Sequence, residues 1–72
     1  MIPEKIQKAA QDRVDIGGKV ILLGEHNGRE VYICEFEEPV TIGLPEVYLW
    51  DGEAAQTIIG ERAADIISAL SD

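Results

Sequence analysis

Two residues that each occur once in the chain, His26 and Cys34, are the first candidates for chemistry. A cysteine thiol becomes a nucleophile when a histidine within roughly 3 Å takes its proton. Negatively charged side chains lie on both sides of the histidine, with Glu25 before it and Glu30 after it. This stretch could therefore hold a catalytic pair, a cation or simply a solvated turn, and the elements around it decide which.

Residues 19–26 and 29–37 are rich in β-branched and aromatic side chains, which favours two strands. Asn27-Gly28 stands between them, and this dipeptide is the strongest short signal for a two-residue hairpin turn, because both positions need positive φ. Such a turn fixes the register. The predicted pairs are His26 with Arg29, Glu25 with Glu30, Leu23 with Tyr32, Ile21 with Cys34, and Lys19 with Phe36.

In this register His26 and Cys34 are five rungs apart and on opposite faces, a separation of roughly 17 Å. A catalytic pair within one chain is therefore not expected. Taken alone, His26 is interpreted as a solvated residue beside the turn, and Cys34 as a small core residue. A reactive thiolate would need positive charge nearby, whereas the next residue is Glu35.

The acidic residues of the hairpin leave two interpretations open. Glu25 and Glu30 face each other at the tip, where like charges repel unless water or a cation screens them. Together with His26 they could bind a metal ion, which is the alternative to a solvated tip. The run of residues 35–38 is likewise either a solvated strand end or an acidic surface for a partner or cation.

Both faces of this hairpin are apolar. One face is predicted to carry Val20, Leu22, Val31 and Ile33, and the other Ile21, Leu23, Tyr32, Cys34 and Phe36. A hairpin with one wet face should alternate apolar and polar residues, so we expect cover on both sides. Helices, a second hairpin or a second copy of the chain could supply it.

Helices are predicted at both ends of the chain. Over residues 2–14 apolar side chains recur at helical spacing, Pro3 suits a first helical turn, and Gly17-Gly18 ends the segment. Over residues 61–70 the apolar positions form a one-sided stripe that follows Gly60.

The region between is less regular. Residues 40–44 are expected to form an extended connection, and residues 46–50 a third strand. Asp51-Gly52 is a second hairpin dipeptide. Residues 53–59 fit either a strand paired back on 46–50 or the start of a longer helix. We favour the strand, because a helix over 53–70 would carry Gly60 in its middle at a cost of about 1 kcal/mol.

Four aromatic residues could gather on the sheet. Tyr32 and Phe36 share one face of the second strand, and Tyr48 and Trp50 share one face of the third. If these faces coincide, they form either core beneath the helices or an interaction surface for a partner or a second copy.

Residues 43–70 resemble the last two strands and last helix of the thioredoxin-type fold. The matching features are Gly43-Leu44-Pro45-Glu46, four apolar residues, Asp51-Gly52-Glu53, and a short run that ends in Gly60 before a helix. The resemblance implies a cis Pro45 that would line a substrate site. The CxxC motif and the upstream βαβ unit of that family do not occur in this sequence, so the resemblance implies no activity and supports only the strand over 53–59.

Composition limits the remaining choices. The chain has 72 residues, of which 46% are hydrophobic and 28% are charged, as expected of one small globular domain covering 1–72. The formal charge of −8 disfavours nucleic acid as a partner. A lone cysteine and the lack of a signal-type or membrane-spanning segment favour the cytoplasm.

We therefore predict an α+β domain with an N-terminal helix, two β-hairpins that form a four-stranded, mainly antiparallel sheet, and a C-terminal helix, with both helices on one face. No catalytic, cofactor-binding or metal site is predicted. The function expected is non-enzymatic binding or assembly through a protein partner or a homodimer, with a surface at Tyr32, Phe36, Tyr48 and Trp50. The alternative is a small redox- or metal-linked accessory protein that uses Cys34 or the His26, Glu25 and Glu30 tip.

Overall fold

A computed structural model describes residues 2–37 and 45–71 of the chain. Its elements are α1 (Glu4–Ala9), α2 (Gln11–Asp15), β1 (Gly18–His26), β2 (Arg29–Phe36), β3 (Glu46–Trp50), β4 (Ala55–Ile59) and α3 (Glu61–Ser71). The strands form one antiparallel sheet in the order β1-β2-β3-β4. The predicted α+β architecture is confirmed, and the predicted connection over 40–44 lies outside the described residues.

The N-terminal segment is two short helices where one helix over 2–14 was predicted. Ala10 separates them with φ −97° and ψ 6°, so its backbone leaves the helical region. The chain bends at this point, and Ala10 itself is buried against the sheet. Gly17 ends the segment with φ +103°, the left-handed conformation expected of a glycine after a helix.

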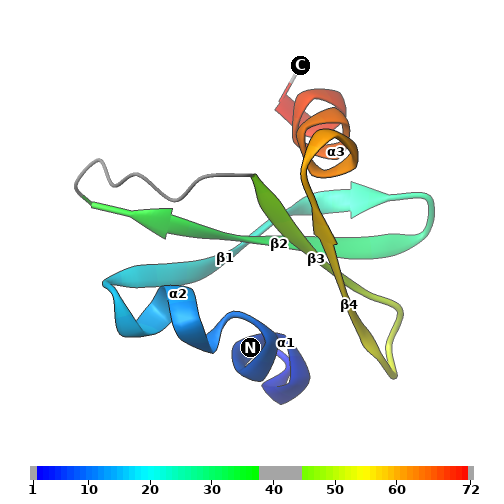
Figure 1. Cartoon of the computed structure of the whole chain (residues 1–72). Coiled ribbons are helices and arrows are strands. Elements are labelled where there is room, and N and C mark those ends of the chain that lie inside the picture. The colour runs from blue at the N-terminus through cyan, green and yellow to red at the C-terminus, as the bar shows by residue number, and fades with distance from the viewer. Residues whose placement is uncertain (1, 38–44, 72) are drawn as a thin grey trace.

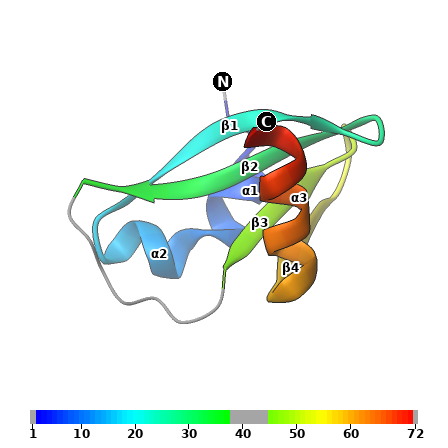
Figure 2. The same ribbon diagram turned by 90° about the horizontal axis from the view of Figure 1, so that it is seen from above.

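The helices cover opposite faces of the sheet, so the prediction that both lie on one face is wrong (Figure 1). On the first face, Ile6 and Ala10 of the N-terminal helices pack on Val20, Tyr32 and Tyr48. On the second face, Ala63 of α3 packs with four strand residues: Val31, Val47, Leu49 and Ile58. The view from above shows α3 crossing the strands while α1 and α2 lie beneath them (Figure 2). Two apolar faces were predicted, and the chain covers both with its own helices.

The first hairpin has the predicted tip but a different register beyond it. Asn27 and Gly28 both have positive φ, at 53° and 79°, and the pairs His26–Arg29 and Glu25–Glu30 form as expected. A β-bulge between Leu22 and Gly24 then shifts the register by one residue. The predicted pairs Leu23–Tyr32, Ile21–Cys34 and Lys19–Phe36 are therefore wrong. The observed pairs are Leu22–Tyr32, Ile21–Ile33, Val20–Cys34, Lys19–Glu35 and Gly18–Phe36.

The bulge changes which side chains of β1 reach which helix. Val20 packs with Tyr32 against the N-terminal helices, and Leu23 packs on the side of α3. The prediction had placed Val20 on the face of Val31 and Leu23 on the face of Tyr32, so both are reversed. The alternation in β2 follows the prediction, since Val31 and Ile33 lie toward α3 while Tyr32 and Cys34 lie toward α1. Because of the one extra residue, β1 contributes Val20 to the core on the side of α1 and Leu23 to the core on the side of α3.

Most of the segment 53–59, which the sequence left open between strand and helix, is a strand. β4 pairs antiparallel with β3, from Trp50–Ala55 to Glu46–Ile59, and Gly60 with φ +86° leads directly into α3. The Asp51 carboxylate accepts hydrogen bonds from the backbone N–H groups of Glu53 and Ala54, at 2.9 and 2.8 Å. These bonds close the turn between the two strands and lower the pKa of Asp51.

Candidate functional site

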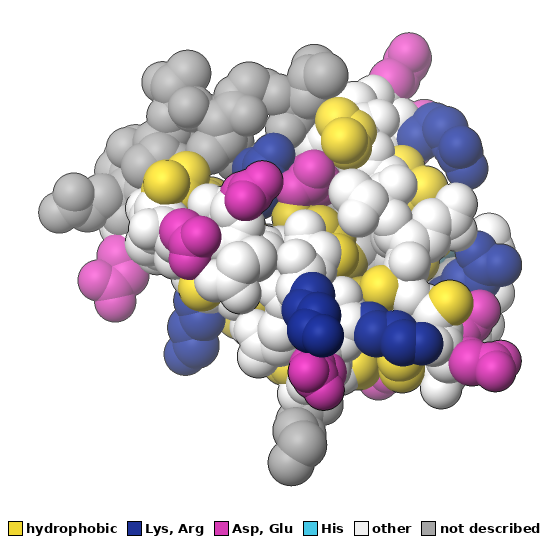
Figure 3. Space-filling model, turned by 60° about the horizontal axis from the view of Figure 1, so that its bottom comes forward, with side chains coloured by type: hydrophobic (Ala, Val, Ile, Leu, Met, Phe, Trp, Pro, Cys, Tyr) yellow, Lys and Arg dark blue, Asp and Glu magenta, His cyan; other side chains and the backbone are white. Residues whose placement is uncertain are grey.

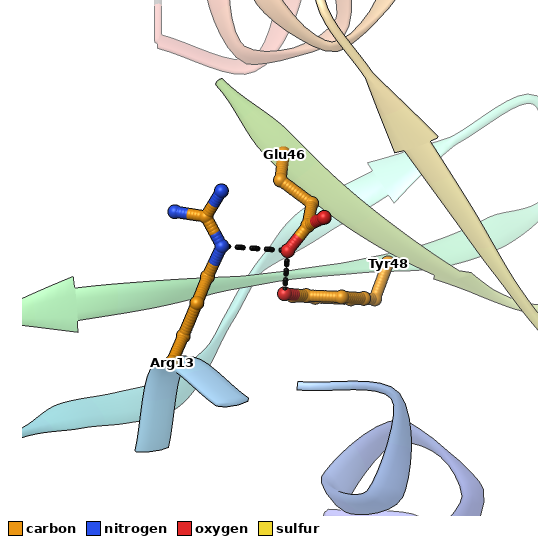
Figure 4. Close-up of polar contacts among 3 residues, drawn as sticks. All are labelled: Arg13, Glu46 and Tyr48. Carbon is orange, nitrogen blue, oxygen red and sulfur yellow. Dashed lines mark hydrogen bonds and ion pairs between the residues drawn. The ribbon is translucent and has the colours of Figure 1, made fainter. Parts of the chain in front are cut away.

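A polar network under α2 joins three side chains from two distant parts of the chain. The Arg13 Nε donates a hydrogen bond to Glu46 Oε2 at 2.6 Å, and the Tyr48 hydroxyl donates to the same oxygen (Figure 4). Arg13 comes from α2, whereas Glu46 and Tyr48 lie two residues apart on β3 and so point to the same face. The network therefore ties the N-terminal helices to the centre of the sheet.

Burial distinguishes this network from a surface ion pair. The side chains of Arg13 and Glu46 are each 16% exposed, and Tyr48 is fully buried. Burial and the Glu46 carboxylate raise the pKa of Tyr48, because both disfavour the phenolate. A tyrosine held neutral is a hydrogen-bond donor and a poor base. The network is thus suited to fixing geometry, and its chemistry is that of a structural ion pair.

Cys34 lies on the same face, next to this network. It packs against the core of Ile6, Val20 and Tyr48 and is partly exposed. Burial raises the pKa of its thiol, Glu46 raises it further, and Arg13 opposes them. A raised pKa keeps the thiol protonated at neutral pH, which makes it a weak nucleophile.

The two unique residues do not meet. Cys34 pairs with Val20 at one end of the hairpin and His26 pairs with Arg29 at the other. At about 3.3 Å per residue, the six positions between Val20 and His26 correspond to roughly 20 Å. The structure therefore agrees with the expectation that no Cys34–His26 pair forms within one chain.

The hairpin tip divides between the two faces of the sheet. Glu25 and Glu30 are direct cross-strand partners. On the face of α1, burial raises the pKa of Tyr32, and Glu30 raises it further. His26 lies next to α3 on the other face. Within the described residues, no three metal-ligating side chains gather at one place.

Two of the four aromatic residues are core. Tyr32 is 4% exposed and Tyr48 is fully buried, so both belong to the core beside α1, while Phe36 and Trp50 are half-buried. On the face that carries α1 and α2, hydrophobic side chains reach the surface as scattered spots between charged and polar groups (Figure 3). The core interpretation holds for the two tyrosines.

An open cleft of about 440 Å³ lies between the hairpin tip and α3. Its lining comes from four elements of the fold: His26, Asn27, Arg29, Leu49, Arg62, Asp65 and Ile66. The sequence predicted that His26 and Arg29 share a face, and they do. It gave no indication that Arg62 joins them, because 32 residues, which include the strands β3 and β4, separate it from Arg29. The Arg13–Glu46 contact was missed for the same reason.

No protein-family model matches the chain, and searches of curated proteins and of solved structures return no significant match. Among the described residues, no helix combines the length and the apolar character needed to cross a bilayer. Function is therefore inferred from the residues of the chain itself.

Proposed function

We propose that this protein is a non-enzymatic assembly module that pairs with a second copy of itself through the free edge of β4. The observation that supports this most directly is an uncharged edge strand in a highly charged chain. Residues 54–60 (AAQTIIG) carry no charge, although 28% of the chain is charged and its net charge is −8. Two such chains repel each other less along this strand than elsewhere.

The hydrogen-bond pattern indicates which backbone groups of β4 are available. The Gly60 N–H donates to the Pro45 carbonyl at 2.9 Å, which makes 45 and 60 a bonded pair. Bonded pairs alternate along an antiparallel ladder, so residues 58 and 56 also bond toward β3. The N–H and C=O groups of Ala55, Thr57 and Ile59 therefore point away from the sheet.

The side chains of this edge also favour contact. Thr57 is exposed, and Ile59 is 55% exposed although it is a large hydrophobic residue. Natural edge strands avoid pairing through charges, prolines and bulges. β1, at the other edge, has a bulge at Leu23 and charged residues at Lys19 and Glu25. β4 has none of these protections, which favours it as the pairing edge.

A two-fold axis through Thr57 gives a self-complementary pair. Thr57 would lie opposite its own copy, and Ile59 opposite Ala55 of the second chain, with about six backbone hydrogen bonds across the interface. Threonine pairs and β-branched pairs are favourable cross-strand neighbours. The two sheets would become one continuous sheet.

The same proposal treats the protein as a non-enzyme of the cytoplasm. The pKa of its thiol is raised, and burial together with Glu46 raises the pKa of Tyr48, so neither group is poised for nucleophilic or acid–base chemistry at neutral pH. A single unpaired cysteine suits a reducing compartment. These features do not favour the redox-linked alternative built on Cys34.

The test is the oligomeric state by sedimentation velocity and light scattering over micromolar to millimolar protein. We expect a concentration-dependent dimer that added salt strengthens, because salt screens the repulsion between two acidic chains. Thr57→Pro should give a monomer with an unchanged circular dichroism spectrum, since the N–H that proline removes points outward.

Leu22→Lys is the matched control, because it alters an exposed side chain of β1, 53% accessible, and should leave the dimer intact. A strict monomer at millimolar concentration would overturn the proposal. So would a dimer that survives Thr57→Pro and dissociates with Leu22→Lys.

A further inference from the structure

The cleft beside α3 collects positive charge in an acidic protein. It takes Arg29 and Arg62 from the six basic residues of the chain, together with the single histidine, and one of the fourteen acidic residues, Asp65. The turn between β1 and β2 projects past α3 (Figures 1 and 2), and residues of this turn and of α3 line the cleft together. A local cationic site on a surface of opposite charge concentrates small anions.

The two arginines can still offer donors to a ligand. The Arg29 Nη1 donates to Gln56 Oε1 at 3.2 Å, which steers the guanidinium along the sheet and leaves its other N–H groups available. Asp51 lies near enough for Arg29 to lower its pKa, yet the two do not form a close ion pair. Arg62 is exposed on the first turn of α3 and makes no ion pair with any residue that the structure describes.

The floor of the cleft is apolar. Leu49 is 8% exposed and Ile66 is half-buried, and both belong to the core under α3. The volume of about 440 Å³ is in the range of sites for small organic molecules. His26 and Asn27 add hydrogen-bonding groups at the rim.

We propose that this cleft binds a small organic anion, in which a phosphate or carboxylate group contacts Arg29 and Arg62 while an apolar substituent packs on Leu49 and Ile66. Guanidinium groups form paired, charge-assisted hydrogen bonds with both kinds of anion. The inference goes beyond self-assembly and uses a different part of the molecule, since β4 contributes its outer backbone to the dimer and the cleft depends on side chains of β1, β2, β3 and α3.

The test is a titration of ¹⁵N-labelled protein followed by amide chemical shifts, with four probes: phenyl phosphate, benzoate, inorganic phosphate and benzyl alcohol. We expect phenyl phosphate or benzoate to shift the amides of His26, Asn27, Arg29, Arg62 and Ile66 and to bind more tightly than inorganic phosphate. The comparison of phenyl phosphate with benzoate identifies the preferred anion. Binding of benzyl alcohol as tight as that of the anions would overturn the proposal.

Arg62→Gln should weaken binding of phenyl phosphate about tenfold or more, since a hydrogen bond to a charged group is lost. Lys19→Gln is the control, because it removes the same charge from an exposed position on β1 that does not line the cleft. An equal loss in both variants would indicate unspecific attraction and overturn the proposal, as would no shift at millimolar ligand. Thr57→Pro should retain binding, so failure of the dimer and failure of the cleft give different results.

Discussion

The two faces of the sheet are built in different ways. Under α3 the buried residues are all aliphatic: Val31, Val47, Leu49, Ile58 and Ala63. Against α1 and α2 the core contains Tyr32 and Tyr48, and the Arg13–Glu46 ion pair lies beside it. The helices differ as well. α3 has 11 residues and an apolar stripe, whereas α1 and α2 have only six and five residues; all three depend on packing for their stability, because isolated helices shorter than about 12 residues are marginal.

The contrast between the two faces indicates which contacts stabilise a short helix. α3 packs on the sheet through its one-sided apolar stripe. The N-terminal helices are also held by polar contacts: the Arg13 Nε donates to Glu46 Oε2, and the Lys5 ammonium donates to the Glu53 carbonyl at 2.8 Å. We therefore expect the face under α1 and α2 to open before the face under α3.

We expect the greatest loss of stability from Ile58→Ala and Ile6→Ala. Each removes one buried isoleucine, one on each face, with exposed fractions of 5% and 0%. Each should lower the free energy of unfolding by about 2–5 kcal/mol at most, because each leaves a cavity. In hydrogen exchange, Ile6→Ala should deprotect α1 and α2 while α3 keeps its protection, and Ile58→Ala should lower protection throughout. Equal loss everywhere with Ile6→Ala would show that the two faces are one cooperative unit.

A second comparison uses one glycine near each face. A Cβ on Gly18 would stand 2.7 Å from the Arg13 carbonyl oxygen and 3.0 Å from Phe36 Cε1, so Gly18→Ala should cost about 1–3 kcal/mol. A Cβ on Gly24 would meet Leu70 Cδ2 at 3.4 Å, an ordinary contact, and Gly24→Ala should be close to neutral. Urea denaturation measures both, and the reverse order would contradict the close approach of α2 to β1.

Removal of the ion pair should have a smaller effect. Arg13→Met keeps much of the aliphatic stem and removes the charge, and we expect a loss of about 1–2 kcal/mol, between the values for exposed and buried pairs. Lys8→Met is the control. Its ammonium lies 3.5 Å from the Glu4 carboxylate at an exposed site on α1, and its loss should cost about 0.5 kcal/mol or less. Equal losses would mean that the network contributes no more than a surface pair.

The least pronounced effect that we expect is a dependence of stability on pH, which comes from Tyr48 in the core against α1. The folded state raises the pKa of Tyr48 above its ordinary value of 10.0, so the contribution of Tyr48 to stability should be constant below about pH 10 and be lost as pH rises further. Tyr48→Phe should reduce this alkaline slope. Some slope should remain, because the pKa values of Tyr32 and Cys34 are also raised. Denaturation curves at increasing pH test this, and an unchanged slope in Tyr48→Phe would contradict it.

Local signals predicted most of the fold. Asn27-Gly28 and Asp51-Gly52 marked the turns, and apolar periodicity marked the strands and α3, because these features depend on neighbours in the chain. The break at Ala10 and the bulge at Leu23 were not predictable in this way. Val20 to Leu23 is a continuous apolar run, which has no alternation to reveal an extra residue.

The candidate sites show the same limit more strongly. The rise per residue along one hairpin was enough to predict that His26 and Cys34 lie far apart. The cleft and the ion pair each join residues from distant segments, and nothing in the spacing of Arg29 and Arg62, or of Arg13 and Glu46, connects them. Such contacts exist only after the elements are placed in three dimensions.

Backbone preferences and the period of apolar side chains were enough to predict the hairpin tip, the four strands, the C-terminal helix and the need for cover on both faces. The folded chain was needed to show that the helices divide between the two faces, that α2 is tied to β3, and that two arginines share a cleft. These features depend on which buried surfaces fit together, and that fit is a property of the whole packed chain.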